Sequence, residues 1–312
     1  SERKLTGNTK MIKLSKLNRR KKFNLFEAVV GCMLVLYGAA VLALILWGFF
    51  ASFRTYASIS KSPWKIFSDL SFKNYIGVFN DFKTIREYDG GFRTIFFEKM
   101  FLNSLLYAGG GALCQTLCTA AVAYCTSRYD NLCSKIIHYT VIVTLSLPIV
   151  GNLASMINVT KKLKIFDSIL GSWIMKFGFS NIYYLIFYAF FKKLSWEFAE
   201  STFLDGGGHY TVFFRIMLPL AVPVIATVFL LNFIQYWNDF ETPYMFLPNH
   251  TTSAVLLYMS VIGGGGMWAG PSPIDVTEQL AAAFMVFLPV FILFLIFRNK
   301  IMGNLSEGGI KG

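Results

Sequence analysis

Residues 194–223 read LSWEFAESTFLDGGGHYTVFFRIMLPLAVP, a polar, interrupted segment between two strongly apolar ones. Glu197 and Glu200 are three residues apart and share one face of the first expected helix. Asp205 precedes a glycine run that breaks this helix, made of Gly206, Gly207 and Gly208. An apolar stretch follows and stops at Leu218 and Pro219. A plain structural linker is the alternative, but a loop that only joins two spans does not need this organisation.

Composition indicates a membrane protein. Hydrophobic residues make up 55% of the 312 residues and charged residues 15%, whereas soluble domains carry about 25% charged residues. Long apolar runs without strict alternation favour helices over barrel strands. We therefore expect an all-α membrane protein with six transmembrane helices at 28–50, 101–124, 136–157, 182–191 extended backwards, 222–246 and 280–297.

The fourth expected span is irregular. Its clean apolar part, residues 182–191, is too short to cross a bilayer. The piece before it, residues 167–178, contains Lys176. A broken or re-entrant helix is therefore predicted, because such backbone is tolerated where protein or water surrounds it.

Charge predicts the topology. In the tail 1–25, nine Lys and Arg residues oppose only Glu2, whereas residues 247–279 contain no Lys or Arg. Both features favour a cytoplasmic amino terminus, and six spans then place both termini and segment 194–219 in the cytoplasm. The long loop 51–99 is basic although it is placed outside, and its acidic residues offset part of that charge. The basic tail indicates contact with anionic membrane lipid rather than nucleic acid.

The expected organisation has four parts. Residues 1–25 form a basic cytoplasmic tail, 26–99 the first transmembrane helix and an external loop, 100–300 a five-helix core, and 301–312 a cytoplasmic tail. That last tail is expected to be too glycine-rich for a stable helix.

Catalytic constellations are absent from the sequence. It contains no phosphate-binding G-x-x-x-x-G-K-[ST] and no H-E-x-x-H motif. Cys114, Cys118 and Cys125 fall on one helical face, but no His or carboxylate accompanies them, so packing is favoured over a metal site. We expect no enzyme activity and no cofactor bound to this chain. The missing catalytic and metal motifs disfavour an enzyme that acts within the membrane.

The segment from Leu194 resembles the cytoplasmic "EAA" loop of importer permeases in the ATP-binding-cassette family. Glu200 matches the glutamate of that pattern and Gly206 the glycine, while Ser201 and Thr202 replace its two alanines. Other parts resemble the carbohydrate branch, in particular the maltose-transporter inner-membrane permease. They cover roughly residues 100–312 in order and comprise Asn103-Ser104, Ala123-Tyr124 with Arg128, Trp237-Asn238-Asp239-Phe240 and the terminal GGIKG.

The resemblance implies a permease subunit in a prokaryotic cytoplasmic (inner) membrane. Its implied partners are a second homologous permease, two ATPase subunits that hold ATP-Mg, an external solute-binding protein and a sugar substrate. Segment 194–219 would be a coupling helix docked on an ATPase through Glu197, Glu200, Asp205, Gly206, Gly207, Leu218 and Pro219. In this role Gly206 would let two helices meet closely, and Asp205 would cap the second helix.

Two further contacts follow from the resemblance. The carboxyl terminus would lie against the ATPases through Gly308, Gly309, Lys311 and Gly312, with a disordered tail as the alternative. The external loop 262–273 would contact the binding protein through Gly264, Met267 and Trp268.

Polar residues in the fifth span are candidates for a solute route. They are spaced to share a broad helical face, and polar groups in a span face the bundle or water; they are Asn232, Gln235, Tyr236, Asn238 and Asp239. Hydrogen bonds between helices are the alternative role. For the whole chain, a permease for another organic solute, such as an acidic saccharide or sugar phosphate, and a channel or sensor without an ATPase are the alternatives to a sugar importer.

Overall fold

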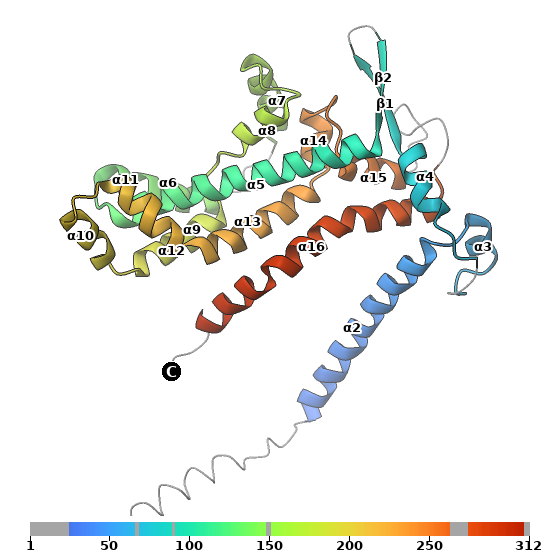
Figure 1. Cartoon of the computed structure of the whole chain (residues 1–312), viewed down its shortest axis with the longest axis horizontal. Coiled ribbons are helices and arrows are strands. Elements are labelled where there is room, and N and C mark those ends of the chain that lie inside the picture. The colour runs from blue at the N-terminus through green and yellow to red at the C-terminus, as the bar shows by residue number, and fades with distance from the viewer. Residues whose placement is uncertain (1–24, 66–68, 89–90, 148–150, 263–273, 309–312) are drawn as a thin grey trace, which may run out of the picture. The chain divides into compact units, whose positions relative to one another are not determined.

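The computed structural model describes residues 25–65, 69–88, 91–147, 151–262 and 274–308 (Figure 1). Outside them lie the expected contact residues Gly264, Met267, Trp268, Gly309, Lys311 and Gly312. The elements in order are α2 (Leu25–Ala51), α3 (Tyr56–Lys61), α4 (Lys73–Asp81), β1 (Lys83–Tyr88), β2 (Gly91–Phe96), α5 (Phe97–Arg128), α6 (Leu132–Ser146), α7 (Leu153–Lys162), α8 (Ile169–Met175), α9 (Ile182–Lys193), α10 (Glu197–Leu204), α11 (His209–Thr211), the π-helix η1 (Val212–Met217), α12 (Leu218–Leu220), α13 (Val222–Trp237), α14 (Glu241–Phe246), α15 (Ser253–Val261) and α16 (Val276–Gly308).

The chain divides into two units, residues 1–50 and 51–312, which we describe separately. The first contains nearly all of α2, a helix of 27 residues that is about 40 Å long at 1.5 Å per residue. Large apolar side chains are exposed around its circumference, among them Met33, Leu34, Val35, Leu36 and Tyr37. A helix that is apolar on all sides and long enough to cross suits a bilayer.

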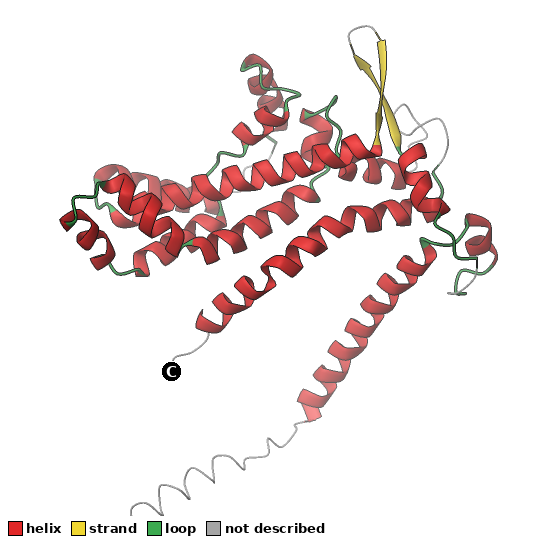
Figure 2. Cartoon of the chain, in the orientation of Figure 1, coloured by secondary structure: helices red, strands yellow, loops and turns green. Residues whose placement is uncertain are grey.

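The second unit is mostly helical, but the prediction of an all-α chain is wrong for residues 83–96 (Figure 2). Strands β1 and β2 pair antiparallel there, with Lys83 opposite Phe96 and Tyr88 opposite Gly91. The strands are rich in Thr, Ile and aromatic residues, and an Asp-Gly dipeptide separates them. That combination is a strong local signal for a β-hairpin, which a search for apolar spans does not detect.

Two clusters of buried side chains form the core of this unit. The first joins α4, α5, α13 and α16 and contains Phe97, Tyr107, Phe233 and Trp237. The second joins α5, α9, η1 and α13 and contains Tyr124, Phe187, Phe191 and Met217. Helix α5 runs through both, and its buried Ala108, Ala112, Ala120 and Ala123 allow neighbouring helices to approach closely.

Three described helices are long and apolar enough to cross a membrane: residues 26–51, 97–128 and 276–298. A fourth crossing is possible for a pair bent by 71°, His209–Leu220 with Val222–Trp237. Helices α6 and α9 are shorter than expected, with 15 and 12 residues. The expected break before α9 is present, since α8 ends at Met175 and α9 begins at Ile182.

Two of the expected spans are not continuous helices. The third, 136–157, is divided because α6 ends at Ser146 and α7 begins at Leu153. Leu147 is extended there, with φ −97° and ψ 121°, because the following Pro148 disfavours a helical conformation. The fifth, 222–246, is divided at Asn238–Phe240 between α13 and α14.

The carboxyl-terminal helix is longer than expected. The sixth span was predicted to end near Phe297, and residues 301–312 were predicted to be too glycine-rich for a helix. Instead α16 continues to Gly308 and contains 33 residues. Only Gly303 interrupts residues 298–307, so the glycine penalty of about 1 kcal/mol applies once within the continued helix.

Candidate functional site

Residues 194–219, which are expected to couple to an ATPase and are called the coupling segment, begin with a helix that its own glycines terminate. In α10 the last carbonyls are satisfied by two hydrogen bonds, Gly207 N to Thr202 O at 2.8 Å and Gly206 N to Phe203 O at 3.1 Å. Gly206 has φ +81°, so these bonds form a Schellman motif with a left-handed residue after the cap. The local sequence Asp-Gly-Gly therefore ends α10 and reverses the chain.

The two glycines have different roles. A Cβ added to Gly206 meets nothing within 4 Å, so the expectation that Gly206 provides close helix approach is wrong. Its positive φ is what favours glycine. Gly207 provides the close approach, because a Cβ there would lie 2.6 Å from Thr202 Cγ2 and 3.0 Å from the Thr202 carbonyl oxygen.

Asp205 does not cap the second helix, contrary to expectation. It is the residue that ends α10. The second helix begins at His209 after Gly208, which has no side chain to bond the first amides. The three-glycine run separates Asp205 from that helix start by more residues than an N-cap side chain spans.

The coupling segment exposes both carboxylates and large apolar groups. Glu197 and Glu200 lie in the first turn of α10, where the helix dipole favours negative charge. Neither forms an ion pair within the part of the chain that the structure describes. Leu204 is 88% exposed and Tyr210 is 84% exposed, so an apolar surface lies beside the carboxylates.

Aromatic side chains fix the coupling segment to the end of α5. Tyr129 contacts Trp196 and His209, with its hydroxyl 2.9 Å from His209 Nδ1. Tyr124 lies 4.9 Å from Phe213 between ring centroids. Arg128 donates to the Leu194 carbonyl and lies over the Trp196 ring. These contacts fix α10 and η1 against α5, which runs through both halves of the core.

The chain bends where the coupling segment joins α13. Leu218 and Pro219 lie in α12, and Ala221 separates α12 from α13 at the 71° bend. The helix thus continues past Pro219 for one residue, and the preceding turn is the π-helix η1. Proline removes one main-chain donor, and a π-helical turn is one way to accommodate the altered hydrogen bonding.

The polar residues of the expected fifth span lie on two faces rather than one. Asn232, Tyr236 and Asp239 face the interior, and Asn232 and Tyr236 are buried. Gln235 and Asn238 are exposed, and the Asn238 side chain donates to the Ile234 carbonyl. The interior face follows the spacing i, i+4 and i+7 of a helix.

An interior polar cluster joins α13 to α5 and to the end of α8. Tyr107 donates a hydrogen bond of 2.8 Å to Asp239 Oδ2. Lys176 Nζ lies 3.8 Å from the same oxygen and 4.1 Å from the Tyr236 ring centroid. Both charged side chains are less than 20% exposed. This arrangement pairs a buried cation with a carboxylate and an aromatic face, all features able to bind a polar solute.

Asn232 forms a hydrogen bond between helices, the role that was the alternative to lining a solute route. Its Nδ2 donates to Thr116 Oγ1 at 3.0 Å, which links α13 to α5. Its Oδ1 is buried without a hydrogen-bond partner among the described residues. The expected route residues are therefore divided between a helix contact, an interior cluster and an exposed face.

Sequence reasoning did not select Lys176, Tyr107 or Thr116 as site residues. Lys176 was detectable as the one cation in an apolar piece, since charged residues within spans are rare. Tyr107 and Thr116 belong to a different helix, and periodicity on α13 carries no information about them.

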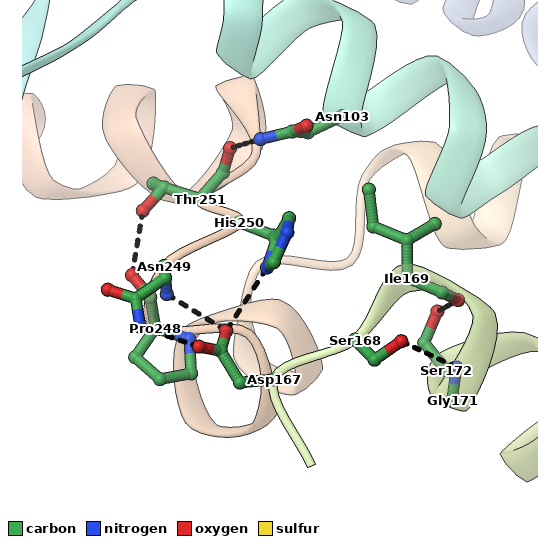
Figure 3. Close-up of polar contacts among 10 residues, drawn as sticks. All are labelled: Asn103, Asp167, Ser168, Ile169, Gly171, Ser172, Pro248, Asn249, His250 and Thr251. Carbon is green, nitrogen blue, oxygen red and sulfur yellow. Dashed lines mark hydrogen bonds and ion pairs between the residues drawn. The ribbon is translucent and has the colours of Figure 1, made fainter. Parts of the chain in front are cut away.

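A second polar cluster lies where the α7–α8 connection meets the α14–α15 connection (Figure 3). Asp167 accepts hydrogen bonds from Asn249 N at 2.9 Å and Asn249 Nδ2 at 2.6 Å, and it lies 3.3 Å from His250 Nδ1. Asn103 donates to the Thr251 carbonyl. We call Asp167, Asn249 and His250 the external latch, because they join the α7–α8 connection to the α14–α15 connection and the expected topology places residues 247–279 outside.

The latch lowers the pKa of the Asp167 carboxyl. Burial alone raises it, but the hydrogen bonds from His250 and from both amides of Asn249 outweigh burial. Asp167 has φ +56°, a conformation that aspartate tolerates better than most residues. The charged form of Asp167 therefore stabilises this connection.

Comparisons with known proteins agree with this architecture. Residues 117–301 match the family of binding-protein-dependent transport system inner membrane components. The chain therefore belongs to this family of membrane transport permeases, and the expected family and membrane location are confirmed.

Individual relatives are more distant. The diacetylchitobiose uptake system permease protein NgcG of Streptomyces coelicolor is 24% identical, over 92% of this chain and 89% of that protein. The arabinooligosaccharides transport system permease protein AraQ of Bacillus subtilis is 26% identical, over 78% and 80% respectively. The fold also matches a crystal structure of a bacterial ABC transporter that imports the acidic polysaccharide alginate, with a TM-score of 0.72 and 18% identity, over 89% of this chain and 97% of that one.

Proposed function

We propose that this chain is a permease subunit of an ATP-binding-cassette importer for a sugar or oligosaccharide. It would pair with a second permease, with two ATPase subunits that bind ATP-Mg, and with an external solute-binding protein. The family membership and the names of the sugar permeases to which the chain is similar support this proposal. The chain itself would hydrolyse no ATP and would contribute half of the solute route.

The observation that carries the proposal is the coupling segment. It is a short helix with two exposed carboxylates, ended by a glycine turn and fixed by aromatic side chains to α5. Its exposed Leu204 and Tyr210 suit a groove on another subunit, because apolar anchors contribute most of the binding free energy at interfaces. Glu197 and Glu200 would orient the contact by pairing with basic groups.

The topology we propose has six spans with both termini in the cytoplasm. The spans are α2, α5, α6, α9, α13 and α16. Helix α6 is about 22 Å long and α9 about 18 Å, both shorter than the roughly 30 Å hydrocarbon core. Helices α8 and α14 complete these crossings, since irregular backbone is tolerated where protein or a water-filled route surrounds it.

In this topology the interior cluster of Tyr107, Lys176, Tyr236 and Asp239 lies between the two ends of the unit. Aromatic faces and paired charges are groups that bind sugar rings and hydroxyls. We propose that this cluster lines the solute route. The outer contacts expected for Met267 and Trp268, and the carboxyl-terminal contact expected for Lys311, belong to the same proposal.

The decisive experiment changes the exposed face of the coupling segment. Leu204→Ser should lower solute-stimulated ATP hydrolysis by the reconstituted complex at least fivefold, because interface anchors contribute about 1–2 kcal/mol or more when truncated. Leu163→Ser is the matched control: Leu163 is 62% exposed and lies beyond α7, away from the coupling segment. Equal ATPase rates in both variants would show that this segment does not couple solute binding to ATP hydrolysis.

Solute identity needs a separate measurement. The ligand of the binding protein that copurifies with the complex should be a saccharide, and uptake of that saccharide should depend on ATP. A non-saccharide organic ligand would leave the importer proposal in place but would replace the sugar as its solute.

A further inference from the structure

A polar cavity lies where α5, α6 and α9 meet, at the end of the unit that carries α10 and α11 (Figure 1). Its volume is about 500 Å³. The last turn of α5 and the following residues contribute Arg128 and Asp130, α6 contributes Lys135 and His138, and α9 contributes Lys192. Neither the interior cluster nor the external latch shares a residue with this cavity.

The cavity has an excess of positive charge. Arg128, Lys135 and Lys192 line it against one carboxylate, Asp130, so its formal charge is +2. Asp130 pairs with Lys135 at 2.9 Å. Arg128 and Lys192 form no ion pair within the described parts of the chain. Arg128 Nε is also buried and lacks a hydrogen-bond partner among the described residues. An anion in the cavity would pair with the Arg128 and Lys192 cations.

An aromatic wall positions one of the cations. His138 stacks on Tyr188 with 4.2 Å between ring centroids, and Lys192 Nζ lies 5.4 Å from the Tyr188 centroid. His138 Nδ1 is 3.1 Å from the Tyr184 hydroxyl, which fixes the imidazole ring. The Lys192 ammonium is therefore held at the wall rather than extended freely into solvent.

An apolar ridge continues from the cavity along α6. Leu132, Ile136, Tyr139 and Val143 follow the spacing i, i+4, i+7 and i+11, which places them on one helical face. They are 73%, 56%, 66% and 54% exposed. Tyr139 belongs to both the ridge and the cavity lining. A basic cavity joined to an exposed apolar ridge matches a molecule with an anionic head and hydrocarbon chains.

We propose that this cavity binds a phosphate group, and that the phosphate is that of an anionic phospholipid whose acyl chains lie along the α6 ridge. The inference rests on the proposed topology, which puts the cavity at the cytoplasmic surface of the membrane. Basic pockets between helices at that surface bind anionic head groups. Free inorganic phosphate presents the same oxygens without the chains and is the other source of this chemistry.

Native mass spectrometry of the complete, delipidated importer tests the proposal. The complex is titrated with phosphatidylglycerol, with phosphatidylcholine and with inorganic phosphate. Lys192→Gln should weaken phosphatidylglycerol binding about fivefold, the effect of one basic residue near an anionic surface. Lys193→Gln removes the same charge from the adjacent position, which does not line the cavity, and should change binding less than twofold. Arg128 is left intact because it also bonds to Leu194.

The outcomes separate the two sources. Phosphatidylglycerol that stays bound in excess inorganic phosphate identifies the lipid, whereas displacement by inorganic phosphate identifies a soluble phosphate; both support a phosphate site. Equal binding by the two lysine variants overturns it. So does lipid binding that appears only after the ATPase subunits are removed, since the cavity would then be covered by a subunit. The assay uses neither ATP nor solute, so its result is independent of whether the coupling experiment succeeds.

Discussion

Two regions of the second unit are held by different forces. In the external latch, Asp167, Asn249 and His250 connect loops distant in sequence through polar side chains. The coupling segment packs on Tyr124 and Tyr129 mainly through aromatic rings, while its Leu204 and Tyr210 remain exposed. Hydrogen bonds satisfy polar groups within the chain, whereas an exposed apolar side chain can still be covered by a partner. The polar groups of the latch are thus satisfied within the chain, and the coupling segment leaves apolar surface uncovered.

The largest expected effect tests how tightly α8 is packed beside the external latch. A Cβ on Gly171 in α8 would lie 2.0 Å from the Ile165 carbonyl oxygen, which is backbone and cannot rotate away. Gly171→Ala should lower the free energy of unfolding by about 3 kcal/mol, the upper part of the range for overpacking. Gly178→Ala is the control, because nothing lies within 4 Å of its Cβ position. The measurement is the thermal unfolding midpoint of the purified complex, and equal midpoints would mean that α8 is not fixed against Ile165.

A smaller effect is expected in the coupling segment. Gly207→Val introduces a Cβ at 2.6 Å from Thr202 Cγ2, and this methyl group can shift only partly. We expect a loss of about 2 kcal/mol in local stability together with weaker coupling of solute binding to ATP hydrolysis. Gly208→Val should do neither, since the space around Gly208 is open and its φ is −93°. Gly206→Ala should have an intermediate effect, because the positive φ of Gly206 is the only feature that disfavours a side chain there. If Gly208→Val uncouples as strongly as Gly207→Val, the close turn at Thr202 is not what positions α10.

The next smaller loss of stability is expected from a substitution in the external latch. Asp167→Asn keeps the shape but removes the charge that accepts bonds from Asn249 and His250. A loss of about 1–2 kcal/mol is expected, since hydrogen bonds to charged groups are stronger than neutral ones. Asp130→Asn is a matched control, because the side chain of Asp130 is 82% exposed and surface ion pairs contribute little. An unfolding midpoint for Asp167→Asn that matches Asp130→Asn would make the latch incidental to stability.

The smallest expected effect is a change in stability at acidic pH, caused by protonation of Asp167. The pKa of Asp167 is lowered by folding, so its stabilisation is fully present above the ordinary aspartate value of 3.8 and is lost as the pH falls through the lowered folded-state value. Below about pH 4 the difference in unfolding midpoint between wild type and Asp167→Asn should therefore shrink. A difference that stays constant with pH would assign the effect of the substitution to shape rather than charge.

Local signals explain what could be predicted. Apolar runs predict α2, α5 and α16 because a bilayer requires about 20 consecutive apolar residues. The Asp-Gly-Gly sequence predicts the end of α10, since glycine readily adopts the left-handed conformation that follows the last residue of a helix. The distinct roles of Gly206 and Gly207 could not be predicted, because the contact with Thr202 depends on the path that the chain takes after the turn.

The interior cluster shows the limit more clearly. Periodicity on α13 placed Asn232 and Asp239 together with Gln235 and Asn238, although the first pair faces α5 and the second is exposed. The spacing of polar residues identifies which of them share a helical face. The positions of the neighbouring helices decide which face points to the interior. Lys176 joined the cluster only because the broken connection between α8 and α9 brings it to Asp239.

The sequence by itself determined the class of protein: an apolar, helical permease with a polar coupling segment between two spans. Hydrophobicity, helix breakers and a family motif are properties of short stretches, so they can be read without knowing what lies beside them. Only the tertiary structure decided which polar residues meet. It brought Asp167 to Asn249 and Lys176 to Asp239, and it gathered Arg128, Lys135 and Lys192 around one cavity. Charge pairs and cavities depend on distances between segments that are far apart in the sequence, and the packing of helices and their connections sets those distances.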